Sequence, residues 1–185
     1  MKLSELMTQK QEPLCGRWLQ AILAEYGEKA ATAWRLNKDP FTNPVGHAFR
    51  TEAPKLVEWS ARGGEVAEAA SALEPILRIR AIQDLSASQA VGFVFKLREL
   101  VRAELASELA GGALDAELAA LDRQVEAMGM VAFDVYVACR ERFYNVRVNE
   151  LKRSVAMLVR RYGLTDPAEA ASPPAPAASH PGGDR

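Results

Sequence analysis

The stretch that decides the fold is LDAELAALDRQVEAMGMVAFDVYVACRERFYNVRVNELKRSVAMLVRRY, residues 114–162. It contains no proline and a single glycine, Gly129. A single helix of this length would be about 70 Å long, because each helical residue adds about 1.5 Å. Since that exceeds the width of one small domain, we expect part of the helix to lie beyond the domain's own core.

Two apolar stripes follow one another along this stretch, and both advance in steps of four and three residues. Such spacing is typical of a helix that packs along a partner helix. We expect the domain itself to cover the first stripe, and we expect the second to form a stem that pairs with another copy of the chain or with another protein. The alternative is a helix that breaks near Gly129 or Asn145 and folds back. The first stripe contains Leu114, Leu118, Leu121, Val125, Met128, Ala132, Val135 and Cys139, and the second contains Tyr144, Val148, Leu151, Val155, Leu158 and Tyr162.

Upstream of this stretch the signals are also helical, and alternating β-branched runs are weak. Asn43 is a good N-cap, and Pro44 follows it at the first helical position, where its missing N–H is not needed. Ser86 and Gln89 form a capping box at the start of another helix. We expect Phe41 to anchor the turn before Asn43. The sequence therefore predicts an all-α, globin-like bundle of about six helices with a long C-terminal helix.

The amino-acid composition and net charge of the chain limit which domains and which kinds of partner it can have. Hydrophobic residues make up 49% of the chain, charged residues 25%, and the net charge is -1. This balance does not favour nucleic acid or an anionic lipid surface as a partner. No window reaches the roughly 18 apolar residues of a membrane-spanning helix, so we expect no membrane insertion. We predict one helical domain over residues 1–162, with 144–162 as its stem, and a disordered Pro/Ala-rich tail over 163–185.

Residues that could support chemistry are few. Of the two histidines, His47 and His180, neither belongs to a recognisable metal or catalytic motif, and metal sites need three or four convergent ligands. A haem also lacks a candidate ligand, since no histidine lies between those two. Cys15 lies near a helix start, where a thiolate is favoured, and Cys139 lies on the first apolar stripe. Two distant cysteines favour a reduced cytoplasm. We expect no catalytic residue, metal or cofactor.

Polar residues within the apolar helices suggest a buried network. Arg78 or Arg80 could pair with Asp134 or Glu141 inside the bundle and set the helix register. The alternative is a solvent-exposed face with ordinary helix ion pairs.

Two functions fit these features. One is a non-enzymatic signalling module that acts through protein partners and dimerises. The other is a small-molecule or redox sensor that binds an apolar ligand in the bundle. Its pocket would be lined by Trp18, Phe49, Trp59, Phe93 or Phe133.

Three blocks of sequence also resemble one known family. They are KDPFTNPVGHAFR (residues 38–50), ALEPILRIRAIQDLSASQAVGFVFKLRELVRAEL (72–105) and AFDVYVACRERFYNVRVNELKRS (132–154). Together, and in this order, they resemble the RsbRD N-terminal domain family over about Leu3 to Arg153.

The resemblance implies a sensor domain related to the non-haem globin domains of RsbR-type stressosome proteins. In those proteins such a domain precedes a STAS output domain that acts on the RsbT kinase. The residues after Arg153 are too few for a STAS or kinase domain, so we expect a stand-alone input module with a STAS-domain, kinase or other signalling partner. The family supplies no catalytic residues to carry over.

Overall fold

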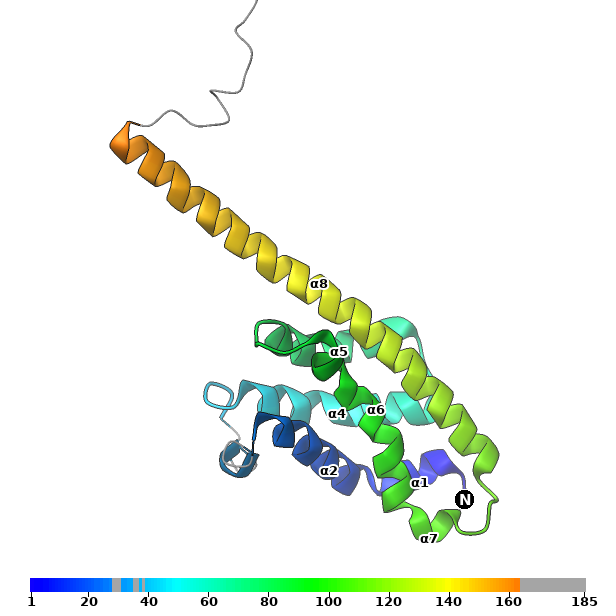
Figure 1. The fold of residues 1–185 in the computed structure, drawn as a ribbon. Coiled ribbons are helices and arrows are strands. Elements are labelled where there is room, and N and C mark those ends of the chain that lie inside the picture. The colour runs from blue at the N-terminus through cyan, green and yellow to red at the C-terminus, as the bar shows by residue number, and fades with distance from the viewer. Residues whose placement is uncertain (28–30, 35–36, 38, 164–185) are drawn as a thin grey trace, which may run out of the picture. The chain divides into compact units, whose positions relative to one another are not determined.

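The computed structural model describes residues 1–27, 31–34, 37 and 39–163, and this part of the chain is all helical, without strands. The predicted tail therefore lies outside the described residues, apart from Gly163. The chain divides into two compact units, Met1–Phe143 and Tyr144–Arg185, which are described separately below. The helices are α1 (Leu3–Gln9), α2 (Gln11–Leu23), the 3-10 helix η1 (Ala24–Tyr26), α4 (Pro44–Arg62), α5 (Val66–Ala81), α6 (Ala87–Glu104), α7 (Ala106–Leu109) and α8 (Asp115–Tyr162) (Figure 1).

Helix α4 is the centre of the first unit, since it packs against α1, α2 and α5, while α2 also packs against α6. Its start confirms the predicted cap. Asn43 is fully buried, and its side-chain oxygen accepts a hydrogen bond from the Gly46 amide at 2.9 Å. The Asn43 amide group also donates to the carbonyls of Trp34 (2.8 Å) and Asn37 (2.9 Å). One side chain thus caps α4 and holds the segment before it.

The predicted role of Phe41 was wrong, because its side chain is 92% exposed. Polar bonds hold this turn instead. The Asp39 carboxylate accepts from the Phe41 amide and from the Thr42 hydroxyl, both at 3.0 Å. Because the turn satisfies its own polar groups, it needs no apolar anchor.

Helix α6 begins at the predicted capping box. The backbone amide of Gln89 donates to the Ser86 hydroxyl at 3.3 Å, and the backbone amide of Ser86 donates to the Gln89 side-chain oxygen at 2.9 Å.

The core of the first unit contains three aromatic rings from three helices. Trp18 of α2, Phe49 of α4 and Phe93 of α6 are all fully buried, with ring centroids 5.1 to 6.0 Å apart.

The first stripe, which begins at Leu114 and continues along α8, packs into this core, as predicted. Leu114, Leu121, Val125, Met128, Ala132 and Cys139 are buried, and Leu118 and Val135 are half-buried against the same cluster. Two polar contacts tie this part of α8 to earlier helices. The Arg102 guanidinium of α6 donates two hydrogen bonds, of 2.9 and 2.6 Å, to the Asp122 carboxylate. The backbone amide of Leu3 donates a hydrogen bond of 2.6 Å to the Glu117 carboxylate.

Helix α8 is continuous at both positions where a break was considered. At Gly129 the ring of Phe95 lies so close that a Cβ atom would clash with it. This glycine therefore allows α6 and α8 to approach closely within the first unit. Asn145 lies within the same regular helix. The fold-back alternative is thus wrong, and α8 extends to Tyr162.

Candidate functional site

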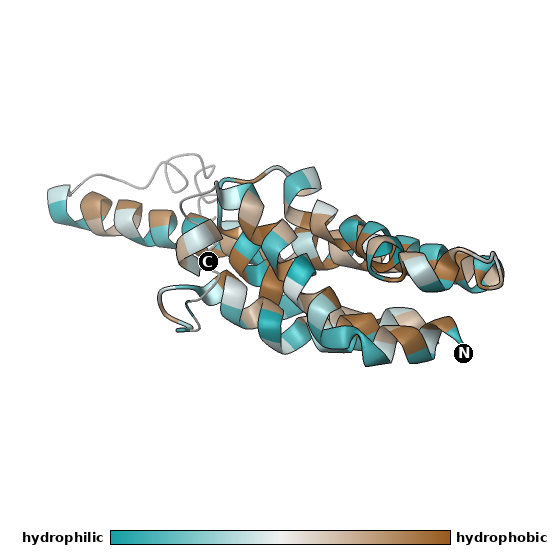
Figure 2. Cartoon of the chain, turned by 90° about the horizontal axis from the view of Figure 1, so that it is seen from below, coloured by the Kyte–Doolittle hydropathy of each residue, from teal (hydrophilic) through white to brown (hydrophobic). Residues whose placement is uncertain are grey.

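The second stripe of α8 is the candidate site, and we call it the seam. Its six residues are large and apolar, yet each is exposed by between 48% and 70%. Along the stem, residues 144–162, hydrophobic and hydrophilic residues alternate in short groups, as the colours of the ribbon show (Figure 2). The seam consists of Tyr144, Val148, Leu151, Val155, Leu158 and Tyr162.

The order of residue types in the seam is that of a two-stranded coiled coil. Taking Leu151 and Leu158 as heptad position d places Val148 and Val155 at position a. β-Branched residues at a and leucine at d favour two parallel helices, because their shapes fit the holes of such a pair. The seam is therefore suited to pack along one partner helix.

The stem differs in charge from the chain as a whole. It contains five basic residues and one acidic residue, Glu150, whereas the complete chain has a net charge of -1. All six charged side chains are exposed. The basic residues are Arg147, Lys152, Arg153, Arg160 and Arg161.

The predicted buried network exists around one arginine, but with a different acid. Arg80 is fully buried, and its guanidinium contacts Glu25 at 2.6 Å, not Asp134 or Glu141. The same guanidinium donates to the Gln89 carbonyl at 2.7 Å and to the Tyr26 hydroxyl at 3.0 Å. A buried arginine with this many acceptors holds η1, α5 and the start of α6 in one arrangement.

The other three residues predicted for the network are exposed: Arg78, Asp134 and Glu141. Sequence reasoning missed Glu25 because it lies 55 residues from Arg80, in a short 3-10 helix after α2. Its neighbour Tyr26 gave a signal, since Leu14, Trp18, Ile22 and Tyr26 recur at four-residue steps, which places Tyr26 on the face of the core residue Trp18.

One arginine of α8 reinforces the end of α5. Arg140 donates to the carbonyl of Ala81 at 2.7 Å and to that of Gln83 at 3.3 Å. The last carbonyls of a helix lack partners within that helix, so a cation there is favourable. The side chain of Gln83 in turn accepts from the Tyr26 hydroxyl at 2.6 Å. The turn after α5 thus contacts both the Arg80 network and α8.

Comparison with known proteins identifies a family for the chain. The family model described as the RsbT co-antagonist protein rsbRD N-terminal domain matches residues 12–151. The chain belongs to this family. No curated protein and no solved structure gave a match. The family is one of regulatory sensor domains rather than of catalytic domains, and its match includes the Arg80 network and the first half of the seam.

The aromatic residues predicted to line a pocket in this RsbRD-type domain mostly fill the core instead. Trp18, Phe49 and Phe93 contact one another, and the Trp18 indole donates to the Phe93 carbonyl at 2.8 Å. Trp59 is also buried, and its indole donates to the Glu65 carbonyl at 3.1 Å. These four side chains are thus part of the packed core, and both indole N–H groups have backbone acceptors.

Phe133 lies elsewhere, in an open apolar groove of the first unit. The groove encloses about 800 Å³ between α6 and α8. Met130 and Phe133 on its wall are 68% and 47% exposed. Besides these two it is lined by Ala87, Ser88, Val91, Gly92, Phe95 and Gly129.

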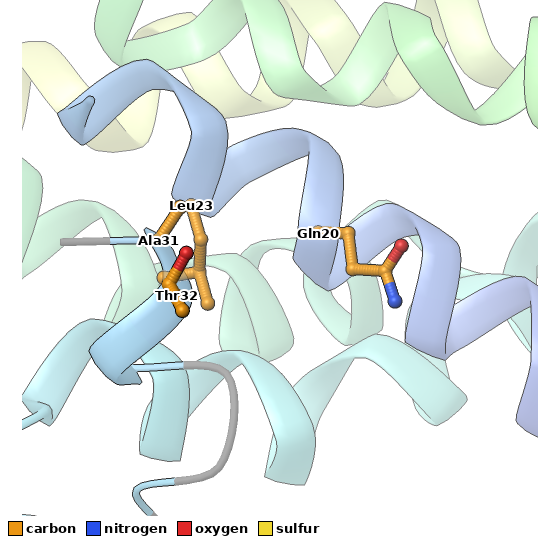
Figure 3. A pocket seen from close by; sticks show the side chains of 4 residues that line it. All are labelled: Gln20, Leu23, Ala31 and Thr32. Atoms are coloured by element: carbon orange, nitrogen blue, oxygen red, sulfur yellow. The ribbon is translucent and has the colours of Figure 1, made fainter. Parts of the chain in front are cut away.

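A smaller depression of about 210 Å³ lies beside the end of α2. Figure 3 shows its four lining residues, Gln20 and Leu23 of α2 with Ala31 and Thr32 of the helical residues 31–34. One amide and one hydroxyl are the polar side chains among them. Among the described residues, none of those that line this depression is charged.

The thiols are not suited to redox chemistry. Burial raises the pKa of Cys15 to about 11, although a position near a helix start by itself favours a thiolate. The reason is that α2 begins at Gln11, so Cys15 lies inside the helix and partly within the core. Burial also raises the pKa of Cys139. Both thiols stay protonated near neutral pH, whereas the reactive form of cysteine is the thiolate.

Within the described residues, the chain has neither a cluster of metal ligands nor a membrane-spanning helix. No three His, Cys, Asp or Glu side chains lie close enough there to hold a metal ion. None of its helices combines the length and the apolar character needed to cross a membrane.

Proposed function

We propose that this RsbRD-type chain is a non-enzymatic, stressosome-like input module that acts through protein contacts made by its seam. The observation that carries the proposal is the exposure of six large apolar side chains at heptad spacing on one helix. Contiguous exposed apolar surface is a feature of protein interaction sites. Fully burying one such side chain contributes about 1.5–3 kcal/mol to the free energy of association. A partner helix that covers the seam would therefore be stabilised by the burial of several side chains.

The first partner that we propose is a second copy of the chain. Val at position a and Leu at position d favour a parallel pair of identical stems. Replacing Leu151 and Leu158 with lysine should reduce the solution mass from dimer to monomer, because four charges would enter one pair of seams. Light scattering after gel filtration measures this mass.

A matched control separates the seam from general effects of added charge. Val146 and Met157 are 57% and 69% exposed, on the same stem, but away from the seam positions. The double variant Val146→Lys, Met157→Lys adds the same charge and should remain dimeric. A dimeric Leu151→Lys, Leu158→Lys variant would reject pairing through the seam.

The further partners belong to signalling. The matching family is described by its relation to RsbT, and we propose a partner of the STAS, kinase or related signalling class for this chain. A cytoplasmic location accords with this role and with the two free cysteines. Purified candidate proteins of these classes can be tested directly for binding to the full chain.

A second candidate function is supported by the groove between α6 and α8. Its apolar walls and volume would suit an apolar ligand of drug-like size. Gly92 offers a sharp test, because a Cβ atom there meets no atom within 4 Å. The variant Gly92→Leu should fill the groove and abolish binding of an apolar fluorescent probe, whereas Gly111→Leu, on the loop before α8, should leave it unchanged. Equal probe binding by both variants would exclude the groove as the ligand site.

A further inference from the structure

The charged residues that flank the seam are all of one sign. In the heptad that places Leu151 at d, Arg147 and Arg161 occupy position g, and Lys152 occupies position e. The other e and g positions of the stem are Asn145, Ser154 and Val159. Glu150, the only acid of the stem, lies at position c, outside the e and g positions but one helical turn from Arg147, where the two side chains can interact. The charged residues at positions e and g are therefore all basic, and we define them, Arg147, Lys152 and Arg161, as the cationic flank.

This cationic flank opposes the pairing that the seam favours. In a parallel pair, the g residue of one helix faces the e residue of the next heptad in its partner. Arg147 would therefore face Lys152 of the second copy, and this like-charge pair would occur twice. Reversing one helix does not relieve the repulsion, because every charged flank position is basic in either orientation.

We propose that the stem binds an acidic polypeptide segment along this cationic flank, and that the segment's carboxylates strengthen the pairing of two stems. This inference rests on the proposed dimer, and it identifies the partner that would strengthen the dimer as an acidic polypeptide. An acidic protein segment fits better than an anionic membrane. The apolar face is a narrow seam with valine at a and leucine at d, whereas helices that lie in a membrane surface typically have a broad apolar face. Carboxylates along the flank would neutralise the repulsion at both Arg147–Lys152 contacts.

The test uses the full chain, sedimentation equilibrium and poly-L-glutamate as the acidic probe. Raising the salt concentration should tighten the dimer on the order of fivefold, because salt screens exposed like charges. Poly-glutamate at low salt should have the same effect. The variant Arg147→Glu should be a tight dimer at low salt without either addition, since opposite charges would then face across the pair. Arg153→Glu, at position f, removes the same charge and should keep the salt dependence of the normal chain.

Three results would overturn the inference. The first is a dimer that weakens or stays unchanged as salt rises. The second is a weaker dimer for Arg147→Glu than for the normal chain. The third is binding to vesicles of anionic lipid with no binding to poly-glutamate, which would assign the flank to a membrane.

The test also separates this inference from the proposed dimer. A chain that stays monomeric in every condition would reject the dimer. Binding of that monomer to poly-glutamate, lost in the double variant Arg147→Glu, Lys152→Glu, would still support an acidic partner. A dimer without salt dependence and without poly-glutamate binding would retain the proposed function and reject the acidic partner.

Discussion

At the residue scale, Asn43 combines two structural roles that usually fall to separate residues. Its oxygen caps α4, and its amide group holds the carbonyls of Trp34 and Asn37. The Ser86 cap of α6 is exposed and makes only local bonds. The two caps should therefore differ in their contribution to stability.

We expect Asn43→Ala to lower the free energy of unfolding by about 2–3 kcal/mol, since it removes both a cap and buried hydrogen bonds. Ser86→Ala should lower it by about 1 kcal/mol, the typical loss for a helix cap. Urea unfolding followed by circular dichroism measures both values. Equal losses would mean that the Asn43 amide bonds add nothing to the cap.

Glu25 should matter more than an ordinary surface acid, because it neutralises the fully buried Arg80. Breaking a buried ion pair typically costs about 3–5 kcal/mol, and we expect roughly 2–3 kcal/mol for Glu25→Gln because Glu25 is partly exposed. Glu58→Gln is the matched control. It breaks an exposed pair with Arg62 at 3.8 Å and should change stability by less than about 0.5 kcal/mol. Similar losses for the two variants would contradict a central role for the Arg80 network.

The raised thiol pKa values predict slow alkylation of the folded chain. At neutral pH Cys15 should react with iodoacetamide much more slowly than a free thiol, and its rate should keep rising until the pH approaches its pKa of about 11. Mass spectrometry of the labelled peptides gives the rate for each cysteine. Fast labelling of Cys15 at neutral pH in the folded chain would revive the redox-sensor hypothesis.

These residues also show what sequence reasoning can reach. Both caps were predictable, because a cap depends on residues within three positions of each other. The partner of Arg80 was not, because the ion pair joins residues 55 positions apart and depends on how α2, α5 and α6 pack. The exposure of Phe41 was missed because an aromatic residue in a turn does not reveal that polar bonds already hold that turn.

At the element scale, α8 has two halves with different surroundings. The first half buries its stripe in the first unit, whereas the seam stays exposed. Heptad spacing was visible for both stripes in the sequence. It predicted that each stripe would pack against another helix, and the change of stripe between Cys139 and Tyr144 predicted that the two would have different partners. The nature of the seam's partner is not encoded in the spacing.

We therefore expect a chain that ends after Phe143 to keep its fold. Its melting temperature should stay within a few degrees of that of the full chain, because the stem contributes no buried side chain. A chain that ends after Gly129 is the contrast, since it lacks the buried residues Ala132, Tyr136 and Cys139 and should unfold. Calorimetry distinguishes the two. Loss of folding in the longer chain would mean that the stem stabilises the first unit.

At the scale of the whole molecule, the domain holds one arrangement of helices inside, and the surface that we propose for binding, the seam, lies on one helix. Three aromatic rings from α2, α4 and α6 contact one another in the core, and the buried Arg80 network ties together helices that are distant in sequence. The turn after α5 contacts this network through Gln83 and contacts α8 through Arg140. A change in the network would therefore reach α8 through direct contacts.

The most direct test of the central claim is capture from a native lysate by the tagged full chain, compared with its two double variants. The account predicts a set of proteins that is retained by the normal chain and by Val146→Lys, Met157→Lys, and is lost with Leu151→Lys, Leu158→Lys. If the seam variant captures the same proteins as the other two chains, partner binding does not use the seam, and the account is wrong.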